Sequence, residues 1–253
     1  GKQEADRSFL SSRDVIDATR AFICVRPLTY ESKDEAPFLE SLFRTRTGDL
    51  ENTVFVLLAP DGKKPLTRSG RSPDMVFGDA ENGGVDEMVS TLDEVASRYE
   101  KAKDGALALP VVKDLRRALD CAACDGLPLV VVEEALAKRL ARLAWGEELI
   151  GRFTYVQVAR LGKLVAIEGA EEGSQVLVVE PDTYGVQGTV LSQGKSFDDD
   201  EALLKVLREG LTRHVKPEKD QRRHVREGTR RGVDWESEIP VTDPGIPKPG
   251  KGR

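Results

Sequence analysis

The chain has 253 residues, 32% of them charged, and a formal net charge of −6. This length suits two domains of ordinary size, and the acidic balance disfavours a general nucleic-acid binder with a basic surface. No apolar stretch reaches the roughly 18 to 20 residues that a membrane span needs, so a soluble protein without such a span is predicted.

The first residues, GKQEAD, contain neither an initiator Met nor an apolar targeting core. The native start is therefore expected to lie upstream, and a removed signal peptide with an extracytoplasmic site is compatible with this beginning. Three cysteines are too few for the disulfide framework of a small secreted protein. The compartment and the oligomeric state stay open.

The first predicted domain covers residues 1–105 and begins with a helix that Ser11 or Ser12 can cap. Apolar residues at three-to-four spacing predict its helices, at residues 13–20, 34–43 and 85–99. Apolar or extended runs that end at turn residues predict its strands, at residues 21–26, 54–60 and 64–70.

The second predicted domain covers residues 106–215. Its helices are predicted by the same spacing, at residues 114–125, 133–145 and 198–211. Its strands are predicted at residues 127–132, 153–158, 175–180 and 189–193. Gly126 supplies a left-handed helix stop, and the acids of 198–201 fit a helix cap better than a metal site.

One pattern occurs in both domains. Residues 54–60 and 176–181 are continuous apolar runs that stop at Pro-Asp, and each is followed by a second extended segment and a helix. Such runs are typical of strands buried on both faces. The repetition predicts a tandem α/β architecture.

The third region, residues 216–253, begins with a charged helix that ends at Gly232 and continues as a Pro/Gly-rich tail. Trp235, Ile239 and Val241 are the apolar residues of this tail. They predict an extended arm that binds its own domain or another protein, and the alternative is simple disorder.

The second domain resembles the thioredoxin fold over roughly residues 109–215, because strand, helix, strand, connection, buried strand, Pro-Asp turn, strand and terminal helix follow in that order. The first domain is similar to a shortened copy. The resemblance implies tandem thioredoxin-like units, each a central mixed sheet flanked by helices, with the first unit incomplete.

Proteins of that family carry Cys-x-x-Cys at a helix start after the first central strand, and a cis-proline before the third. The corresponding residues here are Glu133 and Glu134 in the second domain, and Ser11 and Ser12 in the first. Neither proline position holds a proline. The resemblance therefore implies the fold without any catalytic residue.

Cys121 and Cys124 have the Cys-x-x-Cys spacing but lie at the end of a predicted helix, where the dipole disfavours a thiolate. Structural cysteines, a disulfide with a redox role and a metal site stay open as interpretations. A zinc site needs about four ligands, and His214 and His224 are predicted as surface residues, so no metal and no cofactor are predicted.

Arg68 and Arg71 flank a turn and resemble a small anion-binding loop, although two such arginines are usually only solvated. The residues together predict a non-catalytic thioredoxin-like binding or structural protein, whose partner is a protein bound through the C-terminal arm and not a nucleic acid. The alternative is a thiol-disulfide oxidoreductase or redox sensor that uses Cys121 and Cys124.

Overall fold

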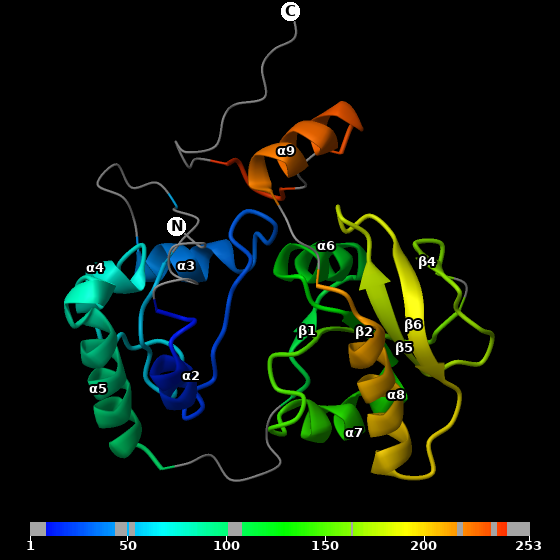
Figure 1. The fold of residues 1–253 in the computed structure, drawn as a ribbon, viewed down its shortest axis with the longest axis horizontal. Coiled ribbons are helices and arrows are strands. Elements are labelled where there is room, and N and C mark those ends of the chain that lie inside the picture. The colour runs from blue at the N-terminus through cyan, green and yellow to red at the C-terminus, as the bar shows by residue number, and fades with distance from the viewer. Residues whose placement is uncertain are drawn as a thin grey trace, which may run out of the picture. The chain divides into compact units, whose positions relative to one another are not determined.

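A computed structural model describes the chain at residues 9–43, 50, 54–100, 108–162, 164–216, 220–233 and 237–241. The chain divides into two compact units. Unit 1 comprises Gly1–Lys101 and Trp235–Arg253, and unit 2 comprises Ala102–Asp234. Helices and a mixed six-stranded sheet make up the described residues, so the protein is mixed α/β (Figure 1).

The six-stranded sheet lies in unit 2 and has the order β1-β3-β2-β5-β6-β4. Its strands are β1 (Val111–Val112), β2 (Leu129–Glu133), β3 (Thr154–Val158), β4 (Ile167–Glu168), β5 (Val176–Pro181) and β6 (Gly188–Gly194). Strands β1, β3 and β2 run parallel, whereas β5 is antiparallel to both β2 and β6. The register pairs Leu129 with Val179 and Val132 with Val176, so β5 ends where β2 begins.

Four described helices belong to unit 2: α6 (Leu115–Asp125), α7 (Glu134–Ala144), α8 (Asp200–Arg213) and α9 (Gln221–Arg230). Helix α6 begins where the Asp114 carboxylate accepts a hydrogen bond from Arg117 N at 2.9 Å, and it ends at Gly126, whose φ is 64°. Asp199 caps α8 in the same way through Ala202 N at 2.8 Å. The predicted stop of α6 at Gly126 and the predicted acidic cap of α8 are therefore confirmed.

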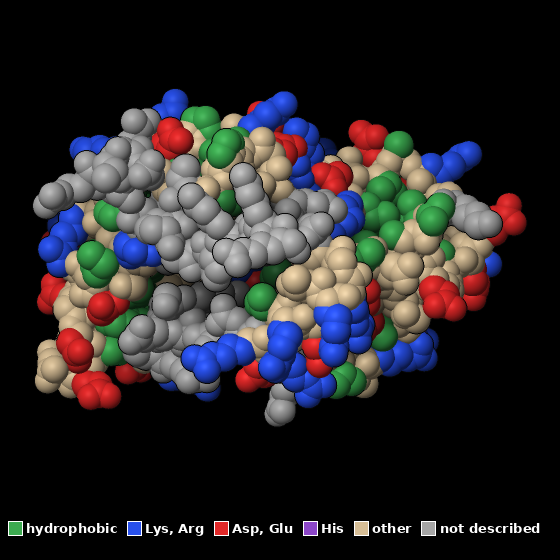
Figure 2. All heavy atoms as spheres, turned by 90° about the horizontal axis from the view of Figure 1, so that it is seen from above, with side chains coloured by type: hydrophobic (Ala, Val, Ile, Leu, Met, Phe, Trp, Pro, Cys, Tyr) green, Lys and Arg blue, Asp and Glu red, His purple; other side chains and the backbone are tan. Residues whose placement is uncertain are grey.

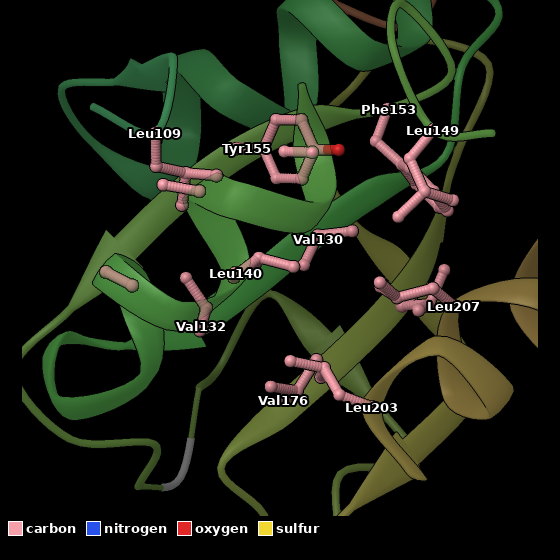
Figure 3. Packing of buried hydrophobic residues seen from close by; sticks show 14 residues of the cluster. Leu109, Val130, Val132, Leu140, Leu149, Phe153, Tyr155, Val176, Leu203 and Leu207 are labelled. Carbon is pink, nitrogen blue, oxygen red and sulfur yellow. The ribbon is translucent and has the colours of Figure 1, made fainter. Parts of the chain in front are cut away.

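Helices cover both faces of the sheet and build two apolar cores. Helices α7 and α8 pack on one face, where Leu140 and Leu207 lie among buried side chains of the strands (Figure 3). Helix α6 packs on the other face through Ala118, Leu119 and Ala122. Every residue from 129 to 132 is fully buried, which confirms a strand buried on both faces.

Tyr155 is the polar exception inside the first of these cores. Its side chain is 3% exposed, and its hydroxyl has no hydrogen-bond partner among the described residues. Burial raises the pKa of this hydroxyl, so the group stays protonated. A buried hydroxyl without a partner loses its hydration and gains nothing in exchange.

Replacing Tyr155 with Phe is therefore expected to raise the free energy of unfolding by about 1 kcal/mol, because the ring stays and the unsatisfied hydroxyl goes. The matched variant is Tyr30→Phe, since the equally buried Tyr30 hydroxyl donates to Leu50 O at 3.1 Å. That variant is expected to lose about 1 kcal/mol. Urea denaturation measures both, and a loss of stability in Tyr155→Phe contradicts the prediction.

The regular structure of unit 1 is helical in its described residues. Its helices are α2 (Arg13–Thr19), α3 (Ala36–Leu42), α4 (Pro73–Phe77) and α5 (Gly84–Ser97), with a 3-10 turn, η1 (Ala80–Asn82). Helices α2 and α5 bury Val15, Met88 and Leu92 against Phe9 and Phe77. The predicted helices at 13–20, 34–43 and 85–99 are thus confirmed, while α4 was not predicted.

Of the strands predicted for this part of the chain, 21–26 is wrong, whereas 54–60 and 64–70 pair in antiparallel fashion without becoming regular strands. Residues 21–26 have no regular structure, and Ile23 and Val25 are 53% and 68% exposed. The run at 54–60 buries only Leu57, and it meets residues 64–70 through two isolated bridges. A strand needs a neighbouring ladder, and the described residues of unit 1 supply none.

The charged segment after α8 folds as predicted into a helix, α9, and Gly232 follows it with φ of 71°. Across the described residues, each helix is too short or too polar to span a lipid bilayer.

Candidate functional site

Cys121 and Cys124 lie in the last turn of α6, where Cys121 is half-buried and Cys124 exposed. Cys124 Sγ is 4.0 Å from Asp120 Oδ1. A thiolate at Cys124 would face both this carboxylate and the negative end of the helix dipole. The surroundings therefore disfavour the reactive form of the thiol.

Carboxylates occupy the start of α7, where the resemblance would place a reactive thiol. Glu133 Oε1 accepts a hydrogen bond from Leu161 N at 2.9 Å, and Glu133 N donates to Gln175 O at 3.0 Å. Gln175 immediately precedes β5, and no described peptide bond is cis. At this helix start, Glu133 therefore holds neighbouring backbone segments through hydrogen bonds.

The cysteines and the start of α7 lie at opposite ends of β2. Helix α6 ends just before Leu129, and α7 begins directly after Glu133. At about 3.3 Å per residue, β2 separates the two ends by about 13 Å. The thiols therefore have no access to the helix start that would activate them.

The acidic run before α8 serves structural contacts. Asp199 is the N-cap described above, and Asp200 Oδ1 lies 2.6 Å from Arg139 Nε. The hydrogen bond from Arg139 lowers the pKa of Asp200, so this carboxylate stays charged. The described part of the chain contains no group of three His, Cys, Asp or Glu side chains placed to hold a metal ion.

Arg68 and Arg71 stand on either side of Gly70, which forms a bridge with Phe55. Both arginine side chains are exposed. The structure thus places the predicted anion-binding pair on the surface of unit 1.

Part of the predicted C-terminal arm lies on its own chain. Glu238 N and Ile239 N donate to Tyr30 O at 2.8 and 3.3 Å, and Lys33 N donates to Glu238 Oε2 at 2.9 Å. Ile239 packs on the small cluster around Tyr30. Val241 is 38% exposed, and Trp235 lies outside the described residues.

Sequence reasoning missed a groove of about 400 Å³ at the end of the sheet where α6 terminates. Among its lining residues are Ala123, Glu180, Asp182, Thr183, Arg213 and Val215. Apolar side chains and both signs of charge thus share one concave surface. The residues come from the end of α6, from the end of β5 with the turn that follows it, and from the end of α8, and no sequence motif joins them.

His214 ties these three elements together beside the groove. Its Nδ1 lies 2.7 Å from Glu180 Oε2 and its Nε2 lies 3.1 Å from Gly126 O. Both partners are hydrogen-bond acceptors, so the ring nitrogen that carries a proton can donate to the partner it faces. The expectation that His214 is a surface residue is wrong, because its side chain is only 11% exposed.

The turn after β5 also carries helix α9. Asp182 Oδ1 accepts hydrogen bonds from Tyr184 N at 3.1 Å and Val186 N at 2.8 Å, which shapes the turn. The Tyr184 ring stacks on the ring of His224 at 4.7 Å, and the Arg231 guanidinium lies 5.4 Å from its centre. Helix α9 therefore packs on the turn that follows the predicted Pro-Asp pair.

No protein-family model, curated protein or solved structure matches the chain.

Proposed function

We propose that the chain is a non-catalytic thioredoxin-like protein with a binding or structural role. The order of strands in unit 2 supports this proposal, since three parallel strands are followed by an antiparallel pair. One helix covers one face and two helices the other, as expected of such a unit. The tandem interpretation extends to unit 1. There, the two segments joined by bridges between α3 and α5 would correspond to the strand pair β5 and β6 of unit 2.

The separation of the thiols from the start of α7 carries this proposal. A disulfide reductase needs an exposed thiolate, a resolving thiol and a cleft for the substrate strand. In unit 2 the helix start holds Glu133 and Glu134, whereas Cys121 and Cys124 lie at the other end of β2 next to Asp120. The parts of a reductase are thus not brought together.

The end of unit 2 where α6 terminates supports a binding role. The groove beside His214 offers apolar and charged groups on one surface, and α9 adds a helix fixed to the neighbouring turn. Val241 keeps an exposed apolar side chain on the arm. A partner protein therefore has surfaces to contact that need no chemistry.

The pre-reduced protein is expected to show no insulin reduction above the background of dithiothreitol. The reason is that nucleophile activation and substrate docking both fail at Cys121 and Cys124. The measurement compares the wild type with Cys121→Ser, and both should give the same turbidity curve.

A wild-type rate clearly above background and lost in Cys121→Ser would instead support the alternative, a thiol-disulfide oxidoreductase or redox sensor. Alkylation of the thiols with iodoacetamide, measured across pH, tests the redox sensor separately from the oxidoreductase. A sensor requires a reactive thiolate near neutrality even without turnover, and slow alkylation at neutral pH argues against it.

A further inference from the structure

Helix α9 carries an exposed row of arginines. Arg222, Arg226 and Arg230 stand four residues apart, Arg223 lies beside them, and all four side chains are exposed. At about 100° per residue, the four fall within an arc of about 100° around the helix axis. These four residues are called the arginine face. Figure 2 looks onto the side where α9 lies in Figure 1, and Lys and Arg side chains gather at its lower centre.

The opposite side of α9 packs on the turn between β5 and β6. His224 and Arg231 contact the Tyr184 ring there, and a Cβ added at Gly228 would lie 3.0 Å from Tyr184 Cε1. By the same rotation, His224 and Gly228 of α9 and Arg231 just after it lie away from the arginine face. The helix is therefore held so that the arginine face points outward.

The arginine face acts against the stability of its own helix. Arg222 and Arg226 are like charges four residues apart, and so are Arg226 and Arg230, a spacing that destabilises helices. Among the described residues, only Arg223 of this face forms an ion pair, with Glu227 at 3.1 Å. A local arrangement that opposes folding is expected where it serves binding.

We propose that the arginine face binds an acidic segment of a partner protein. The proposal names the partner class of the binding function proposed above and rests on it. Guanidinium groups bind carboxylates through two parallel hydrogen bonds, and α9 uses arginine throughout, with no lysine. Three arginines along about 12 Å of helix match carboxylates that repeat at a similar spacing on a partner.

Two observations favour an acidic protein segment over a nucleic acid. The chain as a whole carries −6, and this charge repels a long polyanion that extends beyond the arginine face. Base stacking would need a free aromatic ring, but among the residues that the structure describes, the ring that packs on α9, Tyr184, already contacts His224 and Arg231. A short acidic segment contacts only the arginine face and does not extend over the acidic remainder of the protein.

The test measures fluorescence anisotropy with a labelled peptide of eight glutamates at low salt, with a glutamine version as the matched probe. The full chain is expected to bind the glutamate peptide only, and added NaCl is expected to weaken the binding. Arg222→Gln/Arg226→Gln should lower the affinity by about tenfold or more, since glutamine keeps the helix propensity and removes the charge.

The matched control is Arg152→Gln/Arg160→Gln, which removes two exposed charges elsewhere in unit 2 and should leave the affinity unchanged. Equal affinity of the α9 variant and the wild type overturns the proposal. It is also overturned if an oligodeoxythymidylate of equal charge binds more tightly than the peptide. The insulin assay is separate from this readout, so a failure of either inference can be told from a failure of the other.

Discussion

Replacing Gly185 with Ala is expected to lower the free energy of unfolding of unit 2 by about 3 kcal/mol or more. Gly185 has φ of 62°, and an added Cβ would lie 2.4 Å from Asp120 Cα and 2.8 Å from Asp120 N, both backbone atoms of α6. No rotamer change relieves a clash with backbone. The turn would have to leave α6, and Gly185 O would lose its hydrogen bond from Arg116 Nη1 at 2.7 Å.

Gly173→Ala is the matched control for this variant. Gly173 also has a positive φ, 81°, but nothing lies within 4 Å of an added Cβ. Gly173→Ala should lower the free energy of unfolding by about 1 kcal/mol, which is the cost of the left-handed backbone conformation alone. Urea denaturation, monitored by far-UV circular dichroism, measures the stability of both variants. Equal losses of stability would show that the close contact between Gly185 and the backbone of α6 is unimportant.

A second large effect is expected for Leu207→Ala, which should lower the free energy of unfolding by about 3 to 4 kcal/mol. Leu207 on α8 is fully buried in the core that α7 and α8 form with the sheet (Figure 3). The side chains around it come from several elements, so the cavity cannot collapse without moving a helix.

The control is Val165→Ala in the same unit, because Val165 is 94% exposed and its truncation removes no packing. This change should stay within about 0.5 kcal/mol of the wild type. A Leu207→Ala loss below about 1 kcal/mol would mean that α8 is not anchored in this core.

The local signals of the sequence were sufficient where one residue decides a boundary. Asp114 and Gly126 begin and end α6, and the four apolar residues of β2 from 129 onward read as a doubly covered strand. Each of these features depends on a neighbouring residue or on an unbroken apolar run. Both are visible in the sequence itself.

The same reasoning was wrong where a strand depends on a distant partner. Residues 21–26 have the composition of a strand, but composition does not say whether another strand lies alongside. His214 was misjudged for a related reason, because its partners Glu180 and Gly126 are 34 and 88 positions away. The groove arises from the same three elements and was equally invisible.

The candidate binding helix was predicted as a charged helix, but its orientation was not. Four arginines in ten residues are plain in the sequence, whereas the contact of His224 and Arg231 with Tyr184 depends on a turn some 40 positions earlier. That contact decides which side of α9 faces outward. The sequence thus predicts the charge of the helix, whereas the side on which the arginines are exposed follows only from the tertiary structure.

The discontinuity of unit 1 affects the order in which the nascent chain can fold. Tyr30 and Lys33 contact the arm at Glu238, and Lys33 and Glu238 are 205 positions apart. Ribosomes add about 5 to 20 residues per second, so roughly ten seconds pass while residues 102–234 are made. During this interval unit 2 can fold as a continuous segment. The cluster around Tyr30 gains Ile239 only afterwards, so residues made after unit 2 complete a unit that was begun before it.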